Sequence, residues 1–139
     1  MLKTSLLHPE ILAALGGAGH GSKVLLADGN FPFGTGANPA ARRVYLNLAP
    51  GLLAVTDVLR ALTGAIPIEA AEVMRPATGD EPAVFAEFRA LLPATMALKP
   101  LGRFEFYDAA RHPDVALVIA TGEQRIYANL LLTIGVVMP

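Results

Sequence analysis

Three short polar clusters stand out in a chain that is otherwise rich in apolar residues. They are Gly17–Gly21, which contains His20 and is followed by Asp28; Arg103–Tyr107; and Tyr127–Asn129. The side chains of interest are an imidazole, a carboxylate, a guanidinium, a phenol and a carboxamide. Together such groups can hold a small polyhydroxylated molecule and move a proton on it.

His20 is the first candidate for proton transfer. It lies between Gly19 and Gly21, so neighbouring side chains would not shield its imidazole. Histidine side chains titrate near neutral pH and can give and take a proton within one catalytic cycle. The alternative is a turn histidine that caps the preceding helix or bonds a backbone carbonyl.

Asp28 follows the short apolar run Lys23–Ala27, which is typical of a strand covered on both faces. Ligands of open α/β sheets gather at the carboxyl ends of the strands. A carboxylate at this place could orient His20 or accept hydrogen bonds from ligand hydroxyls. The alternative is an Asx-turn that leads into Gly29 and Asn30.

Three further polar side chains are candidates for ligand binding. Arg103 opens an expected helix, and its planar guanidinium could bond several ligand oxygens; alternatively, it pairs at the surface with Glu105 or Asp108. Tyr127 and Asn129 lie two residues apart and would share one face of an extended strand. They form either a hydrogen-bonding patch or an ordinary pair on an edge strand.

Several other kinds of site are excluded by the patterns. The three histidines are far apart, and no H-x-x-x-H or H-E-x-x-H pattern occurs, so no metal site or cofactor is expected. The glycines near position 17 end a helix instead of opening one, which argues against a dinucleotide site. Neither Ser5 nor Ser22 lies in a G-x-S-x-G elbow.

Composition limits the class of protein. The chain has 139 residues, of which 53% are hydrophobic, and a mean hydropathy of +0.47. We expect a single domain over residues 1–139, and a homo-oligomer, because so small a sphere cannot hide this much apolar material. A net charge of −1 argues against nucleic acid. No run is long enough for a membrane span, and neither an export signal nor a cysteine is present, which favours a cytoplasmic protein.

Helical and strand patterns alternate along the chain. Helices are expected over residues 9–15, 52–62, 82–92 and 104–111, and strands over 23–27, 43–47, 70–74, 115–120 and 129–137. This alternation predicts an α/β fold with helices on both sides of a mostly parallel or mixed sheet.

The ordered set of motifs resembles the ribose pyranase and fucose mutarotase family of sugar mutarotases. The matching segments are Leu2–Thr4, Gly19–Gly21, Asp28–Pro32, Arg103–Tyr107, Thr121–Glu123, Tyr127–Leu132 and Gly135–Val136. The resemblance runs almost from end to end. The Arg103–Tyr107 segment looks like the fucose branch, whereas Gly29 and Asn30 depart from what relatives often carry.

The resemblance implies a three-layer α/β/α sandwich and, in bacterial members, a ring-like decamer with sites near subunit contacts. It implies an isomerase that interconverts the anomers of a free monosaccharide, most simply L-fucose, with D-ribose as the second choice. His20, oriented by Asp28, would carry the proton, with Tyr127 as a second donor, and Asp28, Arg103, Tyr127 and Asn129 would bind the sugar. The alternative function is a non-catalytic monosaccharide-binding or transport-accessory protein.

Overall fold

The computed structural model describes all 139 residues and contains six strands and four helices. The strands are β1 (Lys23–Ala27), β2 (Arg42–Tyr45), β3 (Ile68–Met74), β4 (Leu98–Leu101), β5 (Val115–Ala120) and β6 (Leu130–Ile134). The helices are α1 (Pro9–Gly17), α2 (Val55–Thr63), α3 (Val84–Leu91) and α4 (Arg103–Arg111).

The six strands form one mixed sheet in the order β2-β5-β1-β6-β3-β4. Strand β6 pairs antiparallel with both β1 and β3, whereas the other three pairings are parallel. The start of β6 therefore lies between the carboxyl ends of β1 and β3. Segments that are distant in sequence meet at this edge of the sheet.

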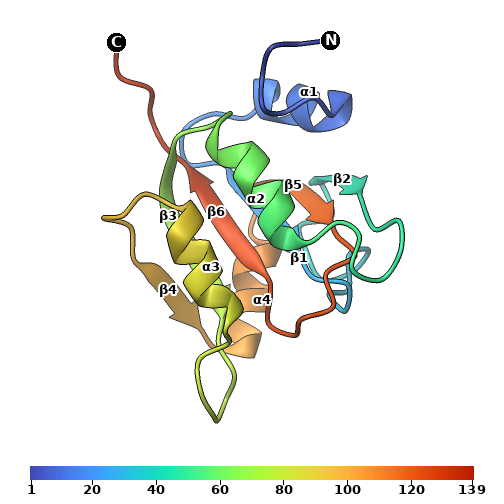
Figure 1. Cartoon of the computed structure of the whole chain (residues 1–139), viewed down its shortest axis with the longest axis vertical. Helices are drawn as coiled ribbons and strands as arrows, with labels where there is room; N and C mark the ends of the chain where they lie inside the picture. Colours follow the sequence, from blue (N-terminus) through green and yellow to red (C-terminus); the bar gives the residue numbers. More distant parts are fainter.

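Helices cover both faces of the sheet. Figure 1 shows α2 and α3 in front of the sheet and α4 behind it. Residues of α1, α2 and α3 share the larger hydrophobic core with one face, and residues of α4 share the smaller core with the other. The predicted three-layer α/β/α arrangement with a mixed sheet is confirmed.

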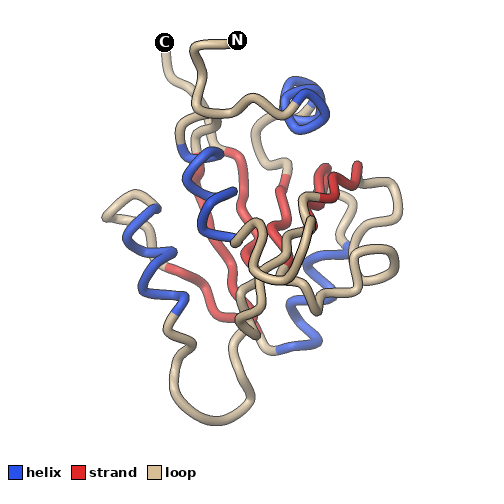
Figure 2. The backbone as a smooth tube through the Cα atoms, turned by 45° about the vertical axis from the view of Figure 1, so that its right-hand side comes forward, coloured by secondary structure: helices blue, strands red, loops and turns tan.

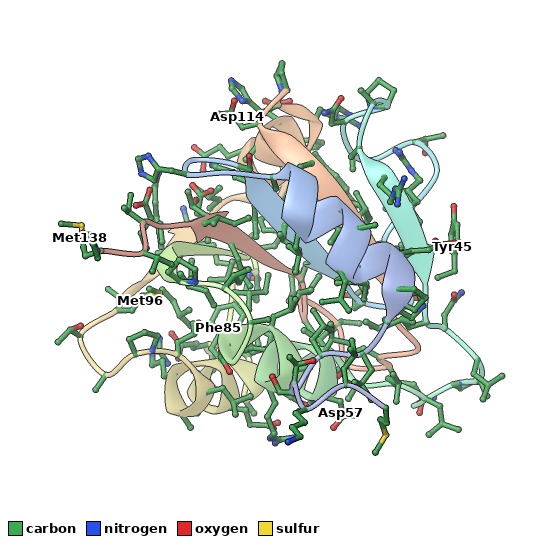
Figure 3. The ribbon with its side chains drawn as sticks, turned by 90° about the horizontal axis from the view of Figure 1, so that it is seen from above. Tyr45, Asp57, Phe85, Met96, Asp114 and Met138 are labelled. Carbon is green, nitrogen blue, oxygen red and sulfur yellow. The ribbon has the colours of Figure 1, made fainter.

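Strands β1, β5 and β6 are almost entirely apolar, as is usual for strands with both faces buried. In β1, Val24 and Leu26 belong to the larger core, whereas Leu25 and Ala27 belong to the smaller core. Strands β5 and β6 are buried in the same way. The edge strands are more exposed, and Tyr45 projects outward from β2 at the margin of the molecule (Figure 3).

One strand was not predicted, and several predicted bounds differ from those in the structure by one to three residues. Strand β4 was not expected, because it is short and half-exposed and contains Pro100, which an edge strand tolerates. Helix α2 begins three residues later than predicted, after Ala54, whose backbone N–H donates to the Asp57 carboxylate at 3.1 Å. Strand β6 begins at Leu130, so Tyr127 and Asn129 precede it.

The two chain termini lie at the same end of the molecule, opposite the edge where the start of β6 meets β1 and β3 (Figure 2). None of the four helices combines the length and the apolar character that crossing a lipid bilayer requires.

The turn after β5 depends on a glycine. A Cβ on Gly122 would overlap the carbonyl oxygens of Leu52 and Ala49. We expect Gly122→Ala to lower the free energy of unfolding by about 1–3 kcal/mol, since backbone atoms must shift. Gly16→Ala is the matched control, because a Cβ there meets no atom within 4 Å. Urea denaturation measures both, and equal midpoints for the two variants would contradict this account.

Candidate functional site

A cavity of about 330 Å³ lies where the start of β6 meets the carboxyl ends of β1 and β3. Strand β4 runs parallel to β3 and leads directly into α4, so the first residue of that helix reaches the same edge. The cavity is lined by Asp28, Asn30, Phe31, Met74, Arg103, Tyr107, Ile126, Tyr127 and Asn129. Four of the five side chains proposed from the sequence are among them.

Asp28 and Asn129 bind each other through two hydrogen bonds. The Asp28 backbone N–H donates to Asn129 Oδ1, and Asn129 Nδ2 donates to Asp28 Oδ2, both at 2.9 Å. Both residues are almost fully buried, with 3% and 4% exposed. These contacts fix the carboxylate in one orientation and leave the second N–H of the Asn129 amide for a ligand.

The charge on Asp28 is held in a poorly hydrated place. Burial is the largest influence and raises the pKa of the Asp28 carboxyl, although hydrogen bonds from Asn30, Ala128, Phe31 and Asn129 act in the opposite direction. The Asn30 N–H donates to Asp28 Oδ1 at 3.0 Å, which is the Asx-turn that the sequence offered as the alternative role of Asp28. Asp28 therefore makes this turn and also lines the cavity.

Tyr127 reaches the cavity by a different backbone route from the one predicted. The two-residue alternation of an extended strand does not apply, because Tyr127 has a φ of 63° and β6 has not yet begun. Positive φ is uncommon for a bulky residue and must be imposed by the surrounding structure. Tyr127 and Asn129 nevertheless line the same cavity, as the strand argument had expected.

Arg103 lines the cavity with no ion pair within the chain. The alternative pairing with Glu105 or Asp108 is absent. Glu105 instead accepts a hydrogen bond from the Gly102 backbone N–H at 2.8 Å, which caps α4. The guanidinium is exposed, so its donors are available to a ligand.

His20 does not lie at this cavity. It precedes β1, whereas Asp28 follows it, so a five-residue strand separates them, about 16 Å of chain. The prediction that Asp28 orients His20 is therefore wrong within a single chain. His20 Nε2 lies 3.0 Å from Oε2 of Glu69, and the His20 side chain is 59% exposed.

Two residues that the sequence analysis did not select contact a predicted site residue or line the cavity. Glu69 is the partner of His20, and sequence spacing gave no signal for this contact, because the residues are 49 positions apart. Tyr107 lines the cavity beside Arg103. Its position four residues after Arg103 is the signal that could have found it, since such residues share a helix face.

An apolar wall completes the cavity. Phe31, Met74 and Ile126 line it, and the Phe31 ring packs against Tyr107 with centroids 5.5 Å apart. No three His, Asp or Glu side chains lie close enough together to hold a metal ion. A carboxylate, two carboxamides, two phenols and a guanidinium beside an apolar wall suit a small molecule that carries both hydroxyl groups and a hydrophobic face.

Known proteins are similar to this chain in sequence and in fold over nearly their full length. The chain is 33% identical over 136 residues to the D-ribose pyranase of Paracidovorax citrulli, covering 98% of each. It is 32% identical to the fucose mutarotase of Homo sapiens, covering 95% of this chain and 90% of that one. The solved structure of Bacillus subtilis RbsD complexed with D-ribose superposes with a TM-score of 0.86 at 25% identity, covering 99% of this chain and 100% of that one.

The family resemblance drawn from the ordered motifs is confirmed by these matches. Residues 1–137 also match the model of one family, which leaves only the last two residues outside the match. The chain belongs to the RbsD / FucU transport protein family.

Proposed function

We propose that this protein is a sugar mutarotase that interconverts the anomers of a free monosaccharide by general acid–base ring opening. The observation that carries the proposal is the cavity that unites Asp28, Arg103, Tyr127 and Asn129. The relatives named D-ribose pyranase and fucose mutarotase support the reaction class. L-fucose is the preferred substrate, because the apolar wall offers a place for a methyl group.

The reaction conserves every atom of the sugar. The ring oxygen gains a proton, the anomeric hydroxyl loses one, and the bond between the anomeric carbon and the ring oxygen breaks. The resulting aldehyde turns, and the ring closes on its other face. The Asp28 carboxylate and the free N–H of Asn129 bind hydroxyls, Tyr127 donates or accepts a proton at its phenolic oxygen, and Arg103 holds oxygens away from the reacting carbon.

His20 completes the site from a second copy of the chain. Within its own chain the imidazole is exposed and oriented by Glu69, far from the cavity. A monomer would leave apolar side chains in water: Ile126, which lines the cavity, is 66% exposed, and Phe104, the sequence neighbour of Arg103, is 79% exposed. A homo-oligomer, a decamer by family resemblance, would cover them and bring the two halves together.

A second candidate function is non-catalytic monosaccharide binding, as in a transport-accessory protein. The absence of His20 from the cavity of its own chain favours this candidate, because the remaining groups bind hydroxyls without it. The two functions differ in whether anomer exchange of a bound sugar exceeds its rate in buffer.

We expect the wild-type protein to accelerate anomer exchange of at least one sugar among L-fucose, D-ribose, L-rhamnose and D-galactose, measured by saturation-difference NMR. His20→Ala should lower the excess exchange rate by roughly 10²-fold or more, the contribution of a positioned proton carrier. His112→Ala is the matched control, because the His112 imidazole is also exposed and also pairs with a carboxylate, that of Asp114. A sugar that raises the melting temperature but exchanges at the buffer rate would favour the binding function.

A mixing experiment tests whether the site is shared. His20→Ala and Asp28→Asn subunits should each keep at most about a tenth of the wild-type excess exchange when assembled alone. When they are unfolded together and refolded as mixed oligomers, about a quarter of the shared sites regain both residues. Recovery of exchange to roughly that fraction supports a composite site, whereas no recovery in well-formed mixed oligomers would place both residues in one chain.

The loss of activity at low pH should follow the protonation of the Asp28 carboxylate. Its pKa lies above the ordinary value of 3.8, so the carboxylate takes up a proton earlier as the pH falls and stops accepting hydrogen bonds from the sugar. We expect kcat/KM to fall through that raised pKa on acidification. Asp28→Asn should flatten this limb and lower the plateau by about 10- to 100-fold. An unchanged acid limb in Asp28→Asn would assign it to another group.

A further inference from the structure

An ion pair between the buried Glu123 and the half-buried Arg125 lies immediately before the Tyr127 turn. Arg125 donates to Glu123 from Nε to Oε1 at 2.9 Å and from Nη2 to Oε2 at 2.8 Å. The Arg125 backbone N–H also donates to Oε1, at 3.0 Å. We propose that Glu123 and Arg125 are positioning residues that set the place of the Tyr127 hydroxyl in the site; this inference rests on the proposed function.

The pair is firmly anchored to the rest of the fold. Glu123 is 5% exposed, and the hydrogen bond from Arg125 is the main cause that lowers the pKa of its carboxyl. Its Oε2 also accepts the Val55 N–H at the start of α2, at 3.3 Å. On the other side, Arg125 Nη1 donates to Glu87 on α3 at 2.6 Å. The two residues therefore tie the turn to two helices.

Tyr127 needs such an anchor because its backbone conformation is unfavourable. A non-glycine residue holds positive φ only when its surroundings over-determine it. On one side of Tyr127, Arg125 is fixed by Glu123 and Glu87. On the other side, Asn129 is fixed by Asp28. The backbone of Tyr127 is therefore held on both sides, at Arg125 and at Asn129.

If the contacts of Arg125 are lost, the Tyr127 side chain has open space into which it can move. A second cavity, of about 490 Å³, also borders the turn and is lined by Arg125, Ile126 and Tyr127 together with residues between Pro76 and Val84. Ile126 and Tyr127 thus border both cavities. The Glu123–Arg125 pair therefore adds to the packing of Tyr127 against the smaller core, which by itself leaves the phenol beside an open cavity.

A double-mutant cycle separates positioning from simple stability. Arg125→Gln should lower kcat/KM for anomer exchange by about 10- to 100-fold, the scale of a misplaced catalytic group. In a Tyr127→Phe background the same change should cost less than about threefold, because the hydroxyl that it positions is already gone. Arg125→Lys should recover little of the lost activity, since a lysine ammonium cannot make the bidentate contact with the Glu123 carboxylate. Equal losses in both backgrounds would overturn the proposal.

Arg89→Gln is the matched control. Arg89 also makes a bidentate ion pair, with Glu81, and neither residue lines a cavity that borders Tyr127. The Arg89→Gln variant should leave the rate of anomer exchange unchanged. If Arg125→Gln fails to fold, Glu87→Gln removes only the exposed tether to α3 and should give a smaller loss with the same dependence on Tyr127.

A second readout does not depend on activity. With 3-fluorotyrosine incorporated, the chain gives ¹⁹F signals from three tyrosines, and Tyr127→Phe identifies one of them. Arg125→Gln should shift or broaden that signal and spare Tyr45, whereas an unmoved Tyr127 signal would overturn the proposal. If no sugar shows accelerated exchange in the wild type, the proposed function fails while this measurement still tests the attachment.

Discussion

The two hydrogen bonds between Asp28 and Asn129 join positions 101 residues apart, and the site is built around them. They are possible because β6 runs antiparallel between β1 and β3, which brings the start of one strand against the end of another. Inside the fold such a pair must be mutually satisfied, since an unpaired buried carboxylate or amide would be costly. The need to satisfy these two groups therefore fixes where a ligand meets the sheet.

The same topology divides the proposed catalytic groups between the two ends of the sheet. Residues that follow β1 or β3, or that precede β6, lie at one end of the sheet. His20 precedes β1 and Glu69 is near the start of β3, so both lie at the opposite end. No rearrangement of loops within a compact chain would close a gap of this kind. Assembly of several copies is then a condition of the proposed chemistry, and the apolar composition supplies the driving force for it.

The segment from Thr121 to Asn129 connects the sheet, the helices and the cavity. Thr121 Oγ1 donates to the Ala27 carbonyl, the Glu123 carbonyl accepts the Gly29 N–H, and Gly122 allows close approach to the Ala49–Leu52 turn. These contacts fix an irregular loop against β1 and against the Ala49–Leu52 turn. A loop of this kind can present a strained tyrosine to a ligand without losing its order.

Much of the fold could be read from periodicity. The unbroken apolar runs of β1 and β5 identified strands buried on both faces, and the boundaries predicted for both were correct. The short edge strand β4 escaped notice, because half-exposed residues and Pro100 leave little pattern. The type of sheet followed from the alternation of elements, but the antiparallel direction of β6 did not, because direction is set by pairing with distant strands.

The sequence by itself determined which chemical groups are available: Asp28, Arg103, Tyr127 and Asn129 were selected from their types and their places at element ends, and all four line one cavity. Only the tertiary structure decided which of these groups touch. It paired Asp28 with Asn129 and His20 with Glu69, and it recruited Tyr107 and the Glu123–Arg125 pair. The physical reason is that residue type and local spacing act over a few positions, whereas contacts between side chains depend on strand order and direction.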